Sequence, residues 1–129
     1  MPGAYLHWAL LFTPASLAHL GERGIDAQDV ADAVFGRYGP VPVRRGGRGA
    51  RERWFVVAPT VGGGLLTCVF RAAQPRDLET QGATVEPVAG RGGGPGRVTG
   101  TMRLCVSARM ADADEVRSYR AWRRSKGGA

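Results

Sequence analysis

Two β-rich runs separated by a glycine turn are the feature that most constrains the fold of this chain. Residues 53–58 and 65–71 are rich in β-branched and aromatic side chains, and residues 59–64 between them contain three consecutive glycines. Such a spacing is typical of a β-hairpin. The sequence therefore predicts two neighbouring antiparallel strands, around which the other elements must be arranged.

The N-terminal part predicts a strand followed by a short helix. Residues 5–12 are apolar on both faces, as in a strand covered on both sides. Thr13 then has the character of a helix N-cap, with Pro14 at the first helical position. We expect this helix to end within residues 21–24.

A second helix is expected directly afterwards. Asp26 is suited to cap it, and Val30 and Val34 recur at helical spacing as its core face. Gly36 and Gly39 provide a stop signal.

The remaining elements complete an α+β domain. Residues 41–45 contain a proline and predict an edge strand, and residues 102–109 predict the last strand. Asp112 and Glu115 form a capping pattern for a C-terminal helix ending near residue 122. We expect one domain over residues 1–129, with an antiparallel sheet of about four strands, two N-terminal helices and one C-terminal helix.

Two segments break the pattern. Residues 73–100 have no clear periodicity and include a Gly/Pro-rich stretch, so we expect a flexible insertion between two antiparallel strands. It serves either as a spacer or, through its arginines, as an RNA contact. Residues 123–129 are polar and predict a frayed tail.

The charge of the chain is positive and is carried almost entirely by arginine. The 129 residues include 17 arginines and one lysine, with a formal net charge of +7. Residues 1–40 carry a net −2, whereas residues 41–71 carry +5 and residues 101–129 carry +4. This asymmetry suits a polyanion or an acidic protein partner. A high genomic GC content, which favours arginine codons, is the alternative explanation.

Several classes of protein are disfavoured. The two cysteines, Cys68 and Cys105, lie in apolar runs and lack the paired spacing of a metal site, so we expect buried thiols and no metal or cofactor. No apolar run is long enough to span a membrane, and the N-terminal apolar run lacks the flanks of a signal peptide. A cytoplasmic location is expected.

Arginines are expected to converge on one face of the sheet. Strict alternation in the last strand places Met102, Leu104, Val106 and Ala108 on one face and Arg103, Cys105, Ser107 and Arg109 on the other. Arg53 and Arg71 lie at the ends of the predicted hairpin and would join them. The C-terminal helix adds Tyr119 and Trp122, with Arg120 and Arg123 beside them.

Such a set of side chains suits the metal-independent cleavage of RNA. The ribose 2′-hydroxyl attacks the neighbouring phosphate, so a protein has only to orient that hydroxyl and stabilise the phosphoryl charge. Guanidinium groups can do this, and an aromatic ring can stack a base. His19 is an additional acid/base candidate, since an imidazole exchanges protons near neutral pH. The alternative is that these arginines are solvated surface charge.

The order of these motifs resembles that of BrnT-family toxins. The resemblance runs through LAHLGERGIDAQDVADAVF (17–35), RWFVVA (53–58), GLLTCVFR (64–71) and MRLCVSARMA (102–111), followed by Glu115 and Tyr119. It implies a RelE/ParE-like fold and a type II toxin–antitoxin pair, in which the toxin is a ribonuclease that arrests translation. It also implies hetero-oligomerisation with a small ribbon-helix-helix antitoxin.

Roles follow from the chemistry and the resemblance together. The candidate catalytic residues are Arg103, Arg109, Arg53, Tyr119 and His19, and the candidate RNA-binding residues are Arg71, Ser107, Arg120 and Arg123. The expected partner is RNA, with mRNA on the ribosome as one candidate target. The alternative is a non-catalytic module on the same fold that binds RNA, the ribosome or a protein partner. The family's His-Gly ending of the first helix reads Arg23-Gly24 here, which favours this alternative.

Overall fold

The predicted hairpin forms the middle of the sheet. In the computed structural model, which describes residues 8–86 and 101–127, strands β3 (Arg53–Pro59) and β4 (Leu65–Ala72) pair antiparallel. Val56 lies opposite Cys68, so the apolar positions of the two strands share one face. The hairpin prediction is therefore confirmed.

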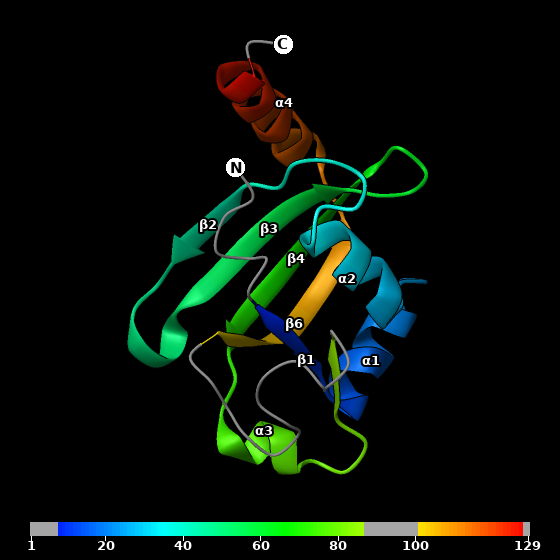
Figure 1. Ribbon diagram of the computed structural model, residues 1–129, viewed down its shortest axis with the longest axis vertical. Helices are drawn as coiled ribbons and strands as arrows, with labels where there is room; N and C mark the ends of the chain where they lie inside the picture. Colours follow the sequence, from blue (N-terminus) through cyan, green and yellow to red (C-terminus); the bar gives the residue numbers. More distant parts are fainter. Residues whose placement is uncertain (1–7, 87–100, 128–129) are drawn as a thin grey trace.

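The sheet is larger than expected and mixed in direction (Figure 1). Its order is β2-β3-β4-β6-β1-β5, which adds β2 (Val43–Gly46), β6 (Met102–Met110), β1 (Ala9–Phe12) and β5 (Thr84–Glu86) to the hairpin. β1 runs parallel to β6, whereas the other pairs are antiparallel. The expectation of about four antiparallel strands is wrong, although the α+β class is confirmed. A three-residue strand such as β5 is too short to leave a periodic signal, and parallel pairing of chain-distant strands depends on tertiary contacts.

The two N-terminal helices begin where the capping residues predict. Thr13 caps α1 (Pro14–Gly21), its Oγ1 accepting a hydrogen bond from the Ser16 N–H at 3.2 Å. Asp26 caps α2 (Ala27–Val34) in the same way, accepting from the Asp29 N–H at 2.8 Å. Each cap satisfies N–H groups that the first helical turn leaves without a partner.

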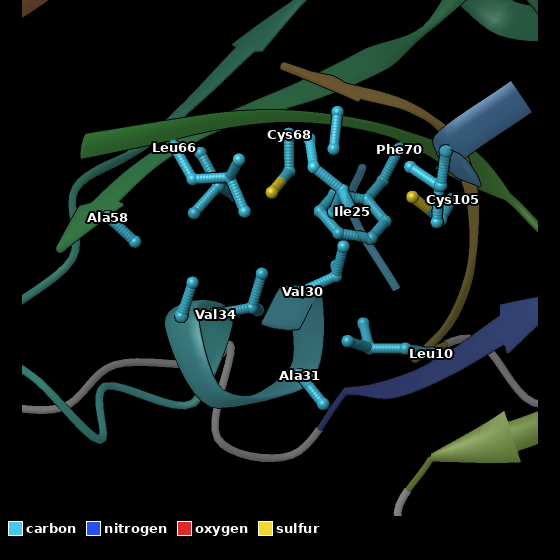
Figure 2. Close-up of a cluster of buried hydrophobic side chains, with 14 of the residues drawn as sticks. Leu10, Ile25, Val30, Ala31, Val34, Ala58, Leu66, Cys68, Phe70 and Cys105 are labelled. Carbon is cyan, nitrogen blue, oxygen red and sulfur yellow. The ribbon is translucent and has the colours of Figure 1, made fainter. Parts of the chain in front are cut away.

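The main core lies between these helices and one face of the sheet. In Figure 2, Val30 and Val34 of α2 point toward the β4 side chains Cys68 and Phe70. Leu10 of β1 belongs to the same buried cluster. All five of these residues are 0% exposed, so the apolar stripe of α2 is completely covered.

A second, smaller core covers part of the opposite face. Leu11 of β1 packs there with Ala73, Met102 and Leu104, beside Leu78 and Val85 as partly buried neighbours. The covering element is α3 (Pro75–Glu79), which contains Leu78, whereas β5 extends the sheet beside β1 and contributes Val85. Residues 73–86 are thus part of the fold, which corrects the expected flexible insertion over that stretch. The rest of the expected insertion, residues 87–100, lies outside the described residues.

The predicted alternation of the last strand is wrong beyond Cys105. Phe70 pairs with Cys105 and Val69 with Ser107, so Val106 is the extra residue of a β-bulge. Cys105 and Ala108 consequently lie in the main core, whereas Met102 and Leu104 lie in the second.

The C-terminal helix α4 (Ala113–Gly127) projects from one end of the sheet (Figure 1). It continues through residues that were expected to be a frayed tail, a correction that applies up to Gly127. Strand β1 begins at Ala9, and the earlier part of the expected first strand, residues 5–7, lies outside the described residues. Among the described helices, none has the length and apolar character needed to cross a membrane.

Candidate functional site

The β-bulge distributes the candidate arginines over both faces of the sheet. Arg103 precedes the bulge and is paired with Ala72, on the face of the main core. Arg109 follows the bulge and is paired with Thr67, on the opposite face. The single arginine face expected from strict alternation therefore does not form.

Arg109 is occupied by an acidic residue of the fold. Its guanidinium makes two hydrogen bonds to the Glu115 carboxylate, at 2.8 and 2.7 Å. Glu115 also accepts from the Thr67 hydroxyl at 3.0 Å and from the Asp112 N–H at 2.8 Å. Burial by itself would raise the pKa of Glu115, but these hydrogen bonds outweigh burial and lower it. The arrangement fastens the start of α4 to the sheet and compensates the charge of Arg109.

Arg71 is compensated in the same manner. It pairs bidentately with Asp77 of α3, at 3.0 and 2.9 Å, and its side chain is only 23% exposed. Burial would raise the pKa of Asp77, and the hydrogen bond from Arg71 and that from the Gln74 N–H lower it. The pair holds α3 against β4.

Arg103 lies in an aromatic cluster. Its Cζ is 4.0 Å from the ring centroid of Trp54 and 5.2 Å from that of Trp8. Partial burial lowers the pKa of Arg103, but an arginine so placed remains charged at neutral pH. Arg45 of β2 lies over the same Trp54 ring, at 5.8 Å.

The other predicted residues are dispersed. The Tyr119 side chain is only 8% exposed, and its hydroxyl donates to the Pro40 carbonyl at 2.8 Å, so it joins α4 to the chain before β2. Arg53 donates to the carbonyls of Ala50 and Glu52.

Ser107 is half-buried beside Val69, and Arg120 and Arg123 are exposed along α4. Neither of these two arginines forms an ion pair with a described residue. Ser107 lies two residues before Arg109 on the same face of β6, whereas Arg120 and Arg123 lie on α4.

Two further predicted residues line the same surface depression. His19 and Arg71 both line a shallow, open depression of about 800 Å³ between the start of α1, α3 and β6. The His19 Nε2 lies 3.1 Å from a terminal nitrogen of Arg23, and its Nδ1 lies 3.6 Å from the Glu22 carboxylate. The depression thus has an imidazole and a guanidinium in its lining, the latter paired with Asp77.

Available positive charge also lies in a segment that the sequence motifs did not indicate. We call residues 44–53, which contain five arginines and one acid, the basic segment. Arg44, Arg48 and Arg51 are exposed, and none of them forms an ion pair with a described acidic residue. Arg48 and Arg51 lie at the 3₁₀-helix η2 (Gly49–Arg51), which joins β2 to β3. The local charge of +5 over residues 41–71 was the signal that pointed to it.

A second groove, of about 670 Å³, separates α4 from β2 and β3. Phe55, Val57 and Trp122 give it an apolar floor, whereas Arg44 and Asp114 bring opposite charges to its lining. Because positive and negative side chains both line this groove, its charge does not indicate which kind of ligand it would bind.

The described residues contain no group of three or more side chains of the metal-binding types close enough to hold an ion. Cys68 and Cys105 are free buried thiols, and burial raises the pKa of Cys105 to about 12. No family model, no curated protein and no solved structure matches the chain.

Proposed function

We propose that this protein binds RNA and that the basic segment is its phosphate-binding surface. One contrast carries the proposal: two of the predicted arginines, Arg71 and Arg109, are neutralised by Asp77 and Glu115, whereas Arg48 and Arg51 are exposed without such a partner and lie close in the chain to the Trp54 ring. A guanidinium already held bidentately by a carboxylate offers a phosphate little net attraction, since binding would require breaking the internal pair.

RNA is favoured as the polyanion because aromatic and guanidinium groups occur together here. Phosphates account for most of the electrostatic affinity in nucleic-acid binding, and unpaired RNA bases stack on aromatic rings. Trp54 immediately follows the basic segment and carries Arg45 and Arg103 over its ring.

The salt dependence of binding tests the proposal. The affinity for a single-stranded RNA, measured by fluorescence anisotropy, should fall linearly on a log–log scale with salt. The double variant Arg48→Gln/Arg51→Gln should bind more weakly and reduce the slope by roughly 0.7 for each phosphate that is no longer neutralised.

The matched control is Arg76→Gln/Arg124→Gln, which removes the same charge from exposed arginines that lie outside the basic segment and form no ion pair with a described residue. If both double variants lose affinity equally, net charge alone explains binding and the basic segment is not the site. If the wild type shows no salt-dependent binding, the arginine content reflects codon usage and the proposal fails.

The second candidate function is that of an RNA-cleaving toxin with a RelE/BrnT-like fold, as the resemblance implies. It is supported by the depression that His19 and Arg71 share. His19 would transfer protons at the 2′-hydroxyl or the leaving oxygen, and Arg71, shifted from Asp77, would contact the phosphate.

Expression in a bacterial host tests this function. The wild type should arrest growth and generate RNA fragments with 2′,3′-cyclic phosphate ends, and His19→Ala should abolish both. Arg76→Ala, on the exposed side of α3, is the control. Normal growth and intact RNA in cells that express the wild type would contradict the ribonuclease function. RNA binding without cleavage would then remain as the proposed function.

Within this second function, we propose a small ribbon-helix-helix antitoxin as the partner and the cytoplasm as the location. An acidic segment of such an antitoxin would compete with RNA for exposed guanidinium groups. Co-expression with the product of the adjacent reading frame should yield a complex that no longer binds RNA. If the product of the adjacent reading frame neither binds this protein nor restores growth, the proposed toxin–antitoxin pair is contradicted.

A further inference from the structure

The ring of Trp54 is held in a fixed position at the end of the main core face. Trp8 meets it edge to face, with centroids 6.1 Å apart and planes at 78°, and Phe70 meets Trp8 in turn at 5.6 Å. The Arg103 Cζ lies over the Trp54 ring at 4.0 Å. Trp8 and Phe70 are buried, whereas Trp54 is only partly buried. The ring is thus rigidly supported and still accessible to solvent.

We propose that Trp54 is the stacking platform for an unpaired nucleobase, so that the RNA bound by this protein is single-stranded at this point. This inference rests on the proposed RNA binding and assigns its substrate class. A duplex cannot use the platform, because the faces of its bases are covered by their neighbours in the stack.

Arg45 is the movable part of this site. It lies directly opposite Trp54 in the β2–β3 register, its Cζ is 5.8 Å from the ring centroid, and its side chain is 68% exposed. It forms an ion pair with Glu52, whose side chain is 20% exposed. An incoming base would take the place of Arg45 over the ring, while Arg45 keeps its ion pair with Glu52.

The basic segment leads the RNA backbone to this platform. Arg48 and Arg51 precede Trp54 by six and three residues, in the same β2–β3 connection. A positively charged track followed by an aromatic ring is the usual composition of single-strand binding sites, in which charge holds the backbone and the ring holds a base.

Two affinities measured in parallel test the inference. A labelled RNA of about 12 nucleotides is titrated as a single strand and as a duplex with its complement, by fluorescence anisotropy at fixed salt. Trp54→Leu should weaken single-strand binding roughly 5- to 100-fold and leave duplex binding and the salt slope unchanged. Trp54→Phe should retain most of the single-strand affinity, and Trp122→Leu, which removes a tryptophan from α4, should retain all of it.

Tryptophan emission gives a second readout. Single-stranded RNA should quench the emission of Trp122→Leu, and this quenching should be reduced when Trp54→Phe is added.

Three results would overturn the platform. In the first, the wild type binds the single strand and the duplex with equal affinity, and Trp54→Leu changes neither. If that binding still depends on salt, the proposed RNA binding stands without the platform. Another is an equal loss of both affinities in Trp54→Leu together with a lower urea midpoint, which would make Trp54 a structural residue only. The third is a wild type that binds no RNA, in which case the proposed function fails as well.

Discussion

Side chains of one chemical type have very different roles in this protein because their immediate partners differ. Arg109 and Arg71 pair with carboxylates, Arg103 lies over two indole rings, and Arg48 and Arg51 face solvent. A guanidinium carries the same charge in each setting, but its capacity to bind a phosphate depends on whether that charge is already compensated.

Tyr119 is expected to act through stability rather than through RNA. Tyr119→Phe removes the hydroxyl that donates to the Pro40 carbonyl at 2.8 Å, and should lower the free energy of unfolding. The expected decrease is about 1 kcal/mol, a typical value for one partly buried hydrogen bond. Urea unfolding measures this decrease, and RNA affinity should stay unchanged.

Tyr38→Phe is the control for this substitution, because no hydrogen bond joins the Tyr38 hydroxyl to a described residue. If Tyr119→Phe has normal stability but weakened RNA binding or cleavage, the result would instead support Tyr119 as a catalytic residue, the role that the resemblance implies.

At the level of elements, two helices are held to the sheet by carboxylate–guanidinium pairs. Glu115 fastens α4 to Thr67 and Arg109, and Asp77 fastens α3 to Arg71. Each pair adds to other contacts of its helix, those of Tyr119 in α4 and Leu78 in α3, so the ionisation of one acidic residue contributes to the attachment of each helix.

Stability should therefore fall in acid. The pKa values of Glu115 and Asp77 are lowered in the folded state, so their contribution is fully present above the unfolded pKa values of roughly 4 and is lost as the pH falls through the lower folded values. Urea midpoints at about pH 6, 4 and 3 should decrease progressively. Glu115→Gln should be less stable at pH 6 by on the order of 1 kcal/mol and show a flatter decrease.

Glu79→Gln is the matched control, since Glu79 is exposed on α3 and forms no ion pair with a described residue. A decrease with pH that is equally steep in Glu115→Gln and the wild type would contradict the proposed anchoring of α4.

The bulge in β6 makes a second prediction at this scale. Deleting Val106 should leave Cys105 opposite Phe70 and Ser107 opposite Val69, because Val106 is the residue without a counterpart. The variant should fold, with far-UV circular dichroism close to that of the wild type. Deleting Val69 instead moves one half of β4 to the wrong face and should prevent folding. Equal damage from both deletions would contradict the assigned bulge.

The whole molecule is a sheet with a core on each face. Leu10 and Leu11 are adjacent in β1, yet each is 0% exposed, one in the main core and one in the second. A sheet covered on only one face would leave one of them in solvent. The helix that covers the second core is α3, within the part of the chain expected to be flexible.

Both cores should therefore be essential for stability. Leu10→Ala and Leu11→Ala should each lower the free energy of unfolding by about 2–5 kcal/mol, the usual cost of truncating a fully buried leucine. Val61→Ala, at a position 77% exposed, should change it by less than about 0.5 kcal/mol. Urea unfolding of the three variants measures these differences. A small effect of Leu11→Ala alone would mean that the second core contributes little.

Local features of the sequence were sufficient for much of the fold. Thr13 and Asp26 predict the starts of two helices, because capping depends only on residues within one turn. The hairpin follows from two β-rich runs and the glycines between them, and Val30 and Val34 identify the buried face of α2. The concentration of positive charge in residues 41–71 is likewise a property of the sequence alone.

Contacts between residues far apart in the chain decided the rest. The Val106 bulge exists because β6 pairs with β4, and one extra residue reverses the face of every side chain after it, which separates Arg103 from Arg109. Glu115 and Asp77 approach their arginines only when α4 and α3 pack on the sheet. The sequence determined where positive charge is concentrated, whereas the tertiary structure decided which arginines remain available, because compensation of a charge requires a partner within a few ångströms.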